Sequence, residues 1–481
     1  MEKRISSEIL HSYPRYDKRK VDDLLTAEAD ADTRKIIVLD DDPTGIQTVH
    51  DLSVYTDWSL ESIGRGFEEK NKLFFILTNS RGFTAEQTAK AHEEIGKRAD
   101  RTAKEMGREY LIVSRGDSTL RGHYPLETEV LKAVLEEQNP WKVDGEILCP
   151  FFAEGGRFTI DNVHYVKYGD ELVPAGETEF AGDKTFGYQS SNLSEYIEEK
   201  TEGRFRADSV VCVSLEDLRG MKLDKITEQL LAVKGFQKII VNAVDEYDIK
   251  VFCIALYRAM GKGKHYIFRT AAAFVKAFGN ISDKPLLTKD EMITEAGRTA
   301  GIVVIGSHTE KTTMQLEELK KTAGLQFVEM DSDLVLVAGG LEREAKRIRT
   351  VCENAVREGK TVVVYTKRRL LSIENDTKEA ALLRSLKISE AVMSLVEKLE
   401  VTPAFIIAKG GITSSDIGTK ALRVKRAQVL GQIRPGVPVW RIGEESKFPG
   451  LPYVIFPGNV GEVTTLREAV ELLMIQRKDS L

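Results

Sequence analysis

The sequence has little of what marks secreted, metal-stapled or membrane-spanning proteins. It contains only four cysteines in 481 residues, far apart and without a Cys-x-x-Cys pair, so neither a zinc site nor a disulfide framework is indicated. The longest apolar runs, such as Thr361–Tyr365, fall far short of the ~20 residues that cross a bilayer. The segment Met1–Asp32 is polar and shows no apolar signal region. We therefore expect a cytoplasmic protein with reduced thiols and no membrane partner.

An excess of one charge is also missing, because 69 basic residues nearly balance 75 acidic residues and leave a formal net charge of −6. Without basic blocks, the chain is a poor candidate for binding nucleic acid. Its length, in contrast, exceeds one ordinary core and predicts roughly two to four domains. We therefore look for small-molecule sites within a multidomain globular chain.

Short β-branched runs alternate with amphipathic stretches along most of the chain. This alternation predicts βαβ units around largely parallel sheets. A first series of strand candidates comprises Ile36–Leu39, Leu73–Leu77, Tyr110–Val113, Glu146–Cys149, Val210–Val213, Lys238–Val241 and Tyr266–Phe268. A second series comprises Ile302–Ile305, Gln326–Glu329, Thr361–Tyr365, Ala404–Ala408 and Tyr453–Phe456.

The polar stretch Phe278–Lys289 separates the two series and is the best linker candidate. We predict a helical lead-in over residues 1–33 and two α/β domains with largely parallel sheets, over residues 34–282 and 295–481. Within the first domain, residues 151–203 are rich in glycine and aromatics and show little periodicity. We expect an irregular insertion there, of the kind that is functional or forms a lid.

Acidic residues follow the first predicted strand, in the run Asp40-Asp41-Asp42-Pro43-Thr44-Gly45. Ligands of open α/β sheets bind at the carboxyl ends of strands, so the position suits a site. Adjacent acids repel one another and need cations, ligand hydroxyls or N–H donors as partners. A single Asp here would be read as a helix cap, whereas three acids with Thr44 and Gly45 favour a functional role.

Two further strand ends in this region are polar. The stretch Ser114–His123 holds two Arg, an Asp, hydroxyl groups and a His, and Thr78–Gly82 adds another Arg. Arginine forks pair with carboxylates, while Asp and Ser exchange hydrogen bonds with sugar hydroxyls. This set suits a polyhydroxy acid, although a surface turn with an ion pair is the plainer alternative. A weaker candidate is Gly155-Gly156-Arg157, where His164 reads more readily as structural than catalytic.

The second domain carries glycine- and hydroxyl-rich loops at its strand ends. They are Gly306–Thr313, Lys409–Asp416 and Pro457–Gly461, the first two before expected helices. Small residues before a helix N-terminus form a ready anion site. Each loop alone could be an ordinary turn, but three together suggest a phosphate or nucleotide site. Neither a Walker A loop nor a Gly-x-Gly-x-x-Gly follows a strand. A cleft between two such domains suits phosphoryl transfer from a nucleotide, usually with Mg²⁺.

Together these motifs resemble the four-carbon acid sugar kinase family. The matching stretches are Asp41–Gly45, Ser114–His123, Gly306-Ser307 with Thr312 and Gln315, Lys409–Thr413 and Pro457-Gly458-Asn459, in order from about residue 35 to 475. The resemblance implies a sugar-acid-binding N-terminal domain, a nucleotide-binding C-terminal domain, and an active site in the cleft between them. It implies ATP as phosphoryl donor and threonate, erythronate or 3-oxo-tetronates as acceptors. Two positions depart from the pattern: Phe456 stands where relatives often carry Lys, and Ile412 where they often carry an acid.

The resemblance and the strand-end motifs give a set of expected site residues. We expect Asp42 and Asp117 as candidate catalytic bases, because an Asp usually accepts the hydroxyl proton in such reactions. The expected substrate-binding residues are Asp41, Thr44, Ser80, Arg81, Arg115, Ser118, Arg121, His123, Gly156 and Arg157. The expected nucleotide-binding residues are Ser307, Thr312, Lys409, Gly410, Gly411, Thr413, Gly436 and Gly458.

Two other functions remain open on the sequence alone. Asp40, Asp42 and Thr44 match the D-x-D-x-T nucleophile motif of haloacid-dehalogenase-like phosphatases, whose further partners are not clear downstream. A non-catalytic sugar-acid sensor would explain the first domain, but it would not need the glycine loops after residue 300. The expected partners are a small sugar acid and ATP. No residue pattern decides the oligomeric state, for which a homodimer is a reasonable expectation.

Overall fold

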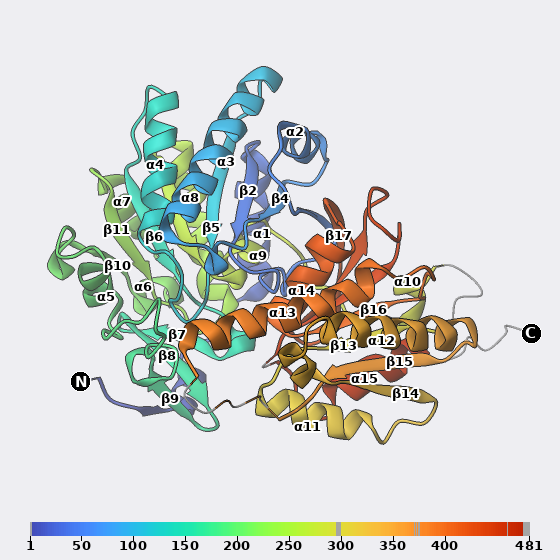
Figure 1. The fold of residues 1–481 in the computed structure, drawn as a ribbon. Coiled ribbons are helices and arrows are strands. Elements are labelled where there is room, and N and C mark those ends of the chain that lie inside the picture. Colours follow the sequence, from blue (N-terminus) through green and yellow to red (C-terminus); the bar gives the residue numbers. More distant parts are fainter. Residues whose placement is uncertain are drawn as a thin grey trace, which may run out of the picture. The chain divides into compact units, whose positions relative to one another are not determined.

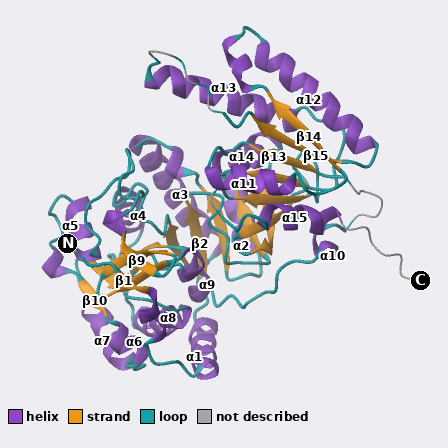
Figure 2. Ribbon diagram, turned by 90° about the horizontal axis from the view of Figure 1, so that it is seen from below, coloured by secondary structure: helices purple, strands orange, loops and turns teal. Residues whose placement is uncertain are grey.

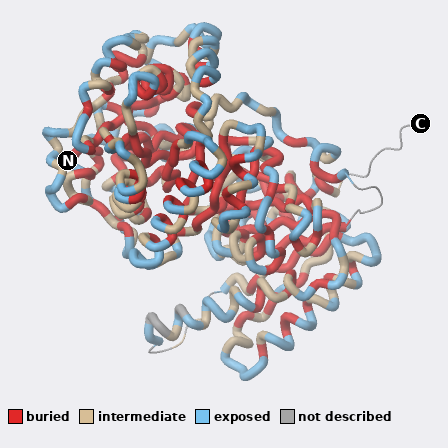
Figure 3. The backbone as a smooth tube through the Cα atoms, turned by 90° about the horizontal axis from the view of Figure 1, so that it is seen from above, coloured by how far each residue is buried: buried red, intermediate tan, exposed pale blue. Residues whose placement is uncertain are grey.

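The computed structural model describes residues 2–294, 300–369, 371, 373, 376–458 and 460–474. It divides into two compact units (Figure 1): Met1–Thr48 with Asp57–Asp283, and Val49–Thr56 with Lys284–Leu481. Each unit is built on a sheet covered by helices, and in Figure 3 the buried residues gather in the interior of each unit. The predicted α/β fold with largely parallel sheets is confirmed. None of the described helices combines the length and apolar character needed to cross a membrane.

The first unit contains a parallel sheet with the strand order β10-β11-β6-β12-β5-β2-β4. These strands are β10 (Val211–Val213), β11 (Gln237–Val241), β6 (Gly145–Cys149), β12 (Tyr266–Thr270), β5 (Tyr110–Arg115), β2 (Lys35–Asp40) and β4 (Leu73–Leu77). From β2 the chain goes to β4 on one side and then to β5 on the other. The sheet therefore has its topological switch point at β2 and β5, where ligands of such sheets bind.

Helices cover both faces of this sheet (Figure 2). On one face α3 packs against α4, and on the other α8 packs against α1, α7 and α9. The helices of the first unit are α1 (Lys18–Ala31), α2 (Leu60–Glu68), α3 (Ala85–Met106), α4 (Leu126–Gln138), α5 (Leu193–Lys200), α6 (Leu215–Arg219), α7 (Leu223–Ala232), α8 (Glu246–Gly261) and α9 (Ala272–Phe278).

Local sequence explains where the long helix α3 begins and ends. Thr84 and Gln87 form a capping box at its start, and Gly107 ends it in the left-handed conformation. Between these caps Ala91, Ile95 and Ala99 recur every four residues and are buried. These local signals account for the bounds of α3.

Residues 151–203 are more regular than their composition suggests. They contribute β7 (Arg157–Ile160), β8 (Val163–Tyr168) and β9 (Glu171–Pro174) to a 4-stranded antiparallel sheet, completed by β1 (Ile5–Ser6). The lead-in before residue 33 therefore begins with a strand and a 3₁₀ turn (Ser7–His11) before α1. The strands are short and joined by tight turns, so neither region shows the longer periodicity on which sequence reading depends.

The second unit has a mixed sheet with the strand order β3-β17-β18-β19-β16-β13-β15-β14. From β19 to β14 the strands are parallel, while β3, β17 and β18 pair antiparallel. The strands are β3 (Leu52–Tyr55), β17 (Arg426–Arg434), β18 (Val437–Ile442), β19 (Pro452–Phe456), β16 (Ile406–Lys409), β13 (Ile302–Ile305), β15 (Thr361–Thr366) and β14 (Leu325–Met330). The antiparallel strands are additions to the parallel strands read from the sequence.

The parallel part of this sheet has its own switch point, between β13 and β16, from which the chain winds in opposite directions. Its core includes Val303, Phe405 and Val454, each without measurable exposure. The helices of the second unit are α10 (Lys289–Met292), α11 (Glu310–Leu319), α12 (Gly340–Arg357), α13 (Lys378–Glu397), α14 (Gly411–Asp416) and α15 (Thr465–Met474). Because α14 begins at Gly411, only Gly410 separates it from β16.

Candidate functional site

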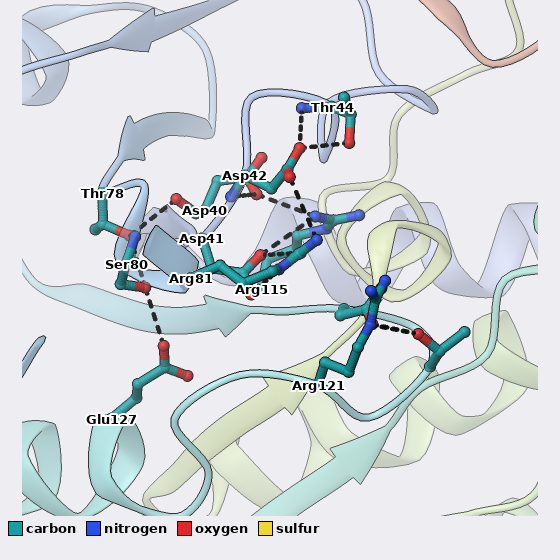
Figure 4. A network of polar contacts seen from close by, with 12 residues as sticks. Asp40, Asp41, Asp42, Thr44, Thr78, Ser80, Arg81, Arg115, Arg121 and Glu127 are labelled. Atoms are coloured by element: carbon teal, nitrogen blue, oxygen red, sulfur yellow. Dashed lines mark hydrogen bonds and ion pairs between the residues drawn. The ribbon is translucent and has the colours of Figure 1, made fainter. Parts of the chain in front are cut away.

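The acidic run of the first unit lies at the switch point of its sheet (Figure 4). Asp40 ends β2 and is 1% exposed, and Asp41 follows it at 3%. Arg115, which ends the neighbouring strand β5, places Nη1 at 3.1 Å from Oδ1 of Asp40 and at 3.7 Å from Oδ1 of Asp41. The two strands thus bring a buried cation between two buried acids.

Gly45 closes over this buried group. A Cβ atom there would lie 2.2 Å from both carboxylate oxygens of Asp40 and 2.3 Å from Nη1 of Arg115, so no larger residue fits without displacement. Burial raises the pKa of Asp40 to about 7, although Arg115 opposes the shift. A carboxyl that is covered in this way is poorly placed to attack an external phosphate, which weakens the phosphatase hypothesis for Asp40.

Arg81 binds the next two acids with its guanidinium fork. Its Nη2 lies 2.7 Å from Oδ1 of Asp41, and its Nη1 lies 3.3 Å from Oδ2 of Asp42. The Asp42 side chain is 21% exposed and also accepts hydrogen bonds from the backbone N–H and hydroxyl of Thr44, at 2.8 and 2.6 Å. Against the effect of burial, Arg81 and Thr44 hold the pKa of Asp42 below its usual range. Asp42 is therefore an ionised acceptor that solvent or a ligand can reach.

The loop after β5 contributes a further carboxylate and a further guanidinium group. Asp117 Oδ2 lies 2.7 Å from Nε of Arg121 and also accepts from the Thr119 hydroxyl. Although burial opposes it, Arg81 and Arg121 hold the pKa of Asp117 well below its ordinary value. The side chains of Asp117 and Arg121 are 12% and 26% exposed, so this pair is half-accessible.

The 151–203 segment fixes the backbone of the same loop. His164 Nε2 donates to the carbonyl of Ser118 at 2.8 Å, and the hydroxyls of Tyr188 and Tyr196 donate to the next two carbonyls, both at 2.9 Å. Burial lowers the pKa of His164 to about 4, so its other nitrogen is free to accept from Thr159 at 3.0 Å. The segment thus holds three successive carbonyls of the loop, and His164 has a structural task.

Two buried residues of this cluster escaped the sequence reading, Arg269 and Glu127. Arg269 follows Phe268 on β12, is 5% exposed, and donates from Nη2 to the Arg121 carbonyl at 2.8 Å. Its Nη1 lies 3.5 Å from Oε2 of Glu127. A Cβ atom at Gly116 would lie 1.2 Å from that Nη1, so the loop passes directly over the guanidinium. The available signal was the arginine directly after the strand candidate Tyr266–Phe268.

The remaining expected residues of the first unit lie around this cluster with different orientations. Ser80 is completely buried and donates to Glu127 at 3.0 Å, and His123 interacts with the Phe83 carbonyl at 3.0 Å. Gly156 forms a turn with φ +77° before Arg157. The structure therefore brings Asp41, Asp42, Thr44, Arg81 and Arg115 together, with Asp117 and Arg121 beside them, while Ser80 and His123 contact protein groups.

Close backbone approaches form the site of the second unit, at its own switch point. Gly306 follows β13 and Gly410 follows β16, so the two turns are neighbours. A Cβ atom at Gly306 would lie 2.2 Å from the Thr413 hydroxyl oxygen, and one at Gly458 would lie 2.9 Å from that of Ser307. Gly410 adopts φ +125°, which side-chain-bearing residues rarely reach. These glycines allow the loops to converge.

Hydroxyl groups line the same turns. Thr309 caps α11, and both Thr309 and Thr312 donate to the Gly458 carbonyl, at 3.0 and 2.9 Å. Ser307 lies 3.0 Å from the Thr312 hydroxyl. Gly436, in the turn between β17 and β18, donates its N–H to Gln432 at 2.6 Å, and a Cβ there would lie 2.8 Å from Val460. Asn459 lies outside the described residues.

Lys409 is the buried cation of this site. Its Nζ donates to the carbonyls of Pro457 and Gly458 at 2.6 and 3.3 Å and lies 4.1 Å from the centre of the Phe456 ring. It pairs with no carboxylate among the described residues, and burial, with nearby Lys311, lowers its pKa to about 7. Lys409 and Phe456 are register partners on adjacent strands. The lysine therefore lies beside the strand end that leads into the last glycine loop.

A cavity of about 280 Å³ opens beside these turns in the second unit. It is lined by Gly306 and His308 after β13, by Ile388 and Val392 of α13, and by Ile412 and Thr413 of α14, among others. The lining combines apolar side chains with hydroxyl groups and the arginines Arg369 and Arg384, and such a mixture of apolar surface and polar groups suits a small molecule. Ile412 is 73% exposed at this position, which suits a flat apolar ligand.

Metal-ligand groups are scarce in the part of the chain that the structure describes. No set of three His, Cys, Asp or Glu side chains there is arranged to hold a metal ion. Magnesium usually relies on one or two carboxylates together with substrate phosphates. The residues at the glycine turns therefore fit a magnesium ion only together with phosphate oxygens.

Comparison with known proteins gives the same division of the chain. A family described as a sugar-binding N-terminal domain matches residues 36–278, and one described as a nucleotide-binding C-terminal domain matches residues 302–466. A search of curated proteins found no match.

Two solved structures share the fold. The crystal structure of Haemophilus influenzae protein HI1011 is 18% identical, covering 91% of this chain and 100% of its own, with a TM-score of 0.61. A Salmonella typhimurium LT2 protein, provisionally named a tRNA synthase, is 16% identical, covering 90% and 98%, with a TM-score of 0.62. At these identities they bear on the fold alone. Because the two family matches follow one another and include both sites described above, the chain belongs to the four-carbon acid sugar kinase family.

Proposed function

We propose that the protein is an ATP-dependent kinase that phosphorylates a hydroxyl of a small, four-carbon-type sugar acid such as a threonate, erythronate or oxo-tetronate. One observation carries the proposal: in a single chain, an Arg–Asp cluster with accessible acceptors occupies one switch point, and glycine turns with an uncompensated lysine occupy the other. The first set suits a polyhydroxy acid, and the second suits phosphates.

The acid site combines guanidinium forks with ionised carboxylates. Arg81 and Arg121 are half-buried and already oriented by Asp41 and Asp117, so they need little reorganisation to bind a ligand. Asp42 keeps free acceptor capacity for sugar hydroxyls. In this proposal the ligand contacts come from Asp41, Thr44, Arg81, Arg115, Ser118, Arg121, Gly156 and Arg157, with Ser80 and His123 supporting the loops.

Asp42 is the favoured general base. It is the most exposed of the clustered carboxylates, at 21% for its side chain against 12% for Asp117 and 3% for Asp41. Its lowered pKa keeps it ionised at neutral pH, as a proton acceptor requires. Besides such a base, phosphoryl transfer mainly requires that the reactants are positioned and that the negative charge on the transferred phosphoryl group is neutralised.

The glycine turns are the proposed phosphate site. The backbone N–H groups near Gly410 and Gly411, the hydroxyls of Ser307, Thr312 and Thr413, and Nζ of Lys409 are the donors available to phosphate oxygens. Gly436 and Gly458 border the same turns, and the cavity beside them would hold the adenine ring of the nucleotide. Bound phosphate would offset the burial that lowers the Lys409 pKa. Mg²⁺ would neutralise phosphate charge, held by the phosphates and water.

The direct test is ADP formation by the purified protein with a panel of erythronate and threonate stereoisomers and ATP–Mg²⁺. We expect at least one acid to stimulate ADP formation and ATP to raise the thermal midpoint. Absence of both effects would overturn the proposal. Hydrolysis of a generic phosphate ester without ATP would instead identify a phosphatase, and tight acid binding without turnover would identify a sensor.

A further inference from the structure

Arg157 differs from the other arginines of the acid site because it forms no ion pair with a residue that the structure describes. Arg81, Arg115, Arg121 and Arg269 each form an ion pair with an acid of the cluster. Arg157 forms neither an ion pair nor a side-chain hydrogen bond with any residue that the structure describes, and its Nε is fully buried without an acceptor. Its guanidinium is thus the uncompensated cation at this site.

The nearby acids do not satisfy Arg157, because they are engaged elsewhere. Asp117 binds Arg121 at 2.7 Å, and Glu179 accepts from the Tyr168 hydroxyl at 2.6 Å. Burial lowers the pKa of Arg157, which shows that its surroundings disfavour the charge. Burying a charge without a partner is costly, and proteins retain such groups where a ligand supplies the counter-charge.

Phe180 lies against the guanidinium of Arg157. Its ring centre lies 5.4 Å from Cζ of Arg157 and 5.1 Å from Cζ of Arg121, so one ring contacts two guanidinium groups. Contact with an aromatic ring does not use up the N–H donors of a guanidinium, and because Nε is buried, the two Nη groups are the donors left for a ligand. Those donors match the two oxygens of a carboxylate.

The chain positions this pair from one segment. Arg157 begins β7 directly after the Gly155-Gly156 turn, and Phe180 follows β9, both within residues 151–203. The same segment holds the backbone of residues 118–120 through His164, Tyr188 and Tyr196. The segment therefore presents an unpaired cation beside a loop whose position it also fixes.

We propose that Arg157, in contact with Phe180, binds the carboxylate of the substrate and selects sugar acids over neutral polyols. The assignment rests on the proposed kinase function. It gives the site a division of roles: Arg157 binds the anionic end of the substrate, whereas the ionised Asp42 and its neighbours bind the hydroxyls. The 151–203 segment is then the part of the protein that recognises the acid group.

The test compares an acid with its neutral counterpart. The probes are the most active stereoisomer among erythronate and threonate and the tetritol of the same configuration, measured as substrate or as competitive inhibitor. We expect Arg157→Gln to lower kcat/KM for the acid by about 10- to 100-fold, because a hydrogen bond to a charged group is lost. The change should come from a higher KM. The kcat/KM or inhibition constant measured for the tetritol should stay within about twofold of the wild-type value.

Matched variants separate recognition from folding. Arg157→Lys keeps the charge without the fork and should recover part of the loss. Arg206→Gln removes an exposed arginine whose partner is Asp208, with side chains 74% and 72% exposed, and should change neither constant. The thermal midpoint of Arg157→Gln should match that of the wild type, because no described ion pair is broken.

The results also distinguish this inference from the function on which it rests. If the wild type phosphorylates an acid but Arg157→Gln weakens acid and tetritol equally, or neither, the assignment of Arg157 is wrong and the kinase function stands. A clear fall in thermal midpoint with equal loss for both probes would make Arg157 structural. If the wild type phosphorylates none of the acids, the proposed function itself fails and the assignment fails with it.

Discussion

The two sites hold their charges in different ways. In the first unit, buried acids are neutralised by buried arginines, as in the contacts of Arg115 with Asp40 and of Arg81 with Asp41. In the second unit, the described residues around the buried Lys409 offer it backbone carbonyls and an aromatic ring but no carboxylate. A cluster built of ion pairs is oriented before its ligand arrives, whereas an uncompensated cation, such as Lys409 in the second unit or Arg157 beside the cluster of the first, leaves the counter-charge to the ligand.

The largest expected effect is on kcat and concerns the carboxylate of Asp42, which remains accessible within the ion-pair network. Asp42→Asn should lower kcat about 10²- to 10⁴-fold, because the amide cannot accept the substrate proton. Thermal shift by ATP should stay as in the wild type, since Asp42 belongs to the first unit. Steady-state kinetics and ATP titrations measure the two properties. A variant that keeps full kcat would remove Asp42 from the chemistry and leave Asp117 as the candidate base.

Removing a buried carboxylate from the ion-pair network should lower the free energy of unfolding substantially. Asp41→Asn leaves Arg81 and Arg115 without part of their compensation, and losing one partner of a buried pair costs about 3–5 kcal/mol. Denaturant unfolding would measure this loss in the free energy of unfolding. Asp208→Asn, at an exposed pair, is the control and should cost less than about 1 kcal/mol. Equal effects of the two substitutions would remove the contrast between buried and exposed pairs.

Removing the buried charged group of the second unit should instead weaken nucleotide binding. Lys409→Met removes a buried cation that has no described acid partner, so stability should be unchanged or higher. KM for ATP should rise about 10- to 100-fold through the lost phosphate contact, with KM for the acid unchanged. Kinetics with each substrate varied in turn would check this. A rise in KM for the acid alone would contradict the assignment of Lys409 to the nucleotide.

A further expected effect is a dependence of stability on pH. Burial lowers the pKa of Lys409 to about 7 in the folded protein, against 10.5 for an ordinary lysine. Between these values the unfolded chain binds the extra proton, so this residue's contribution to stability improves as the pH rises from about 7 towards 10.5. The free energy of unfolding of the wild type relative to Lys409→Met should therefore increase across that range. A flat difference would show that Lys409 stays charged when folded.

The sequence predicted the places where the sites lie better than the roles of individual side chains. Parallel strands carry continuous β-branched runs, so β2, β4, β5, β13 and β16 could be recognised together with their polar ends. Arg269 was missed because its strand candidate stopped at Phe268, and nothing local indicates that a glycine loop passes over it. Such contacts depend on register between distant strands, which one sequence does not reveal.

The antiparallel strands illustrate the same limit. β17 alternates between exposed and buried residues only at its start and contains Gly431, and β18 contains Pro438, so both look like loop when β-branched runs are the criterion. β3 is more remote, because Leu52–Tyr55 precedes most of the first unit in the chain but belongs to the second. Pairing between segments that distant is fixed by tertiary packing and has no local signal.

The central claim is that the chain joins a sugar-acid site to a nucleotide site for phosphoryl transfer. The most direct measurement is ³¹P NMR of a mixture of the protein, ATP–Mg²⁺ and each erythronate or threonate stereoisomer. The account predicts a new phosphomonoester signal that grows as the γ-phosphate signal of ATP falls, with ADP in equal amount. Loss of the γ-phosphate signal with only inorganic phosphate appearing, or no change with any acid, would contradict it.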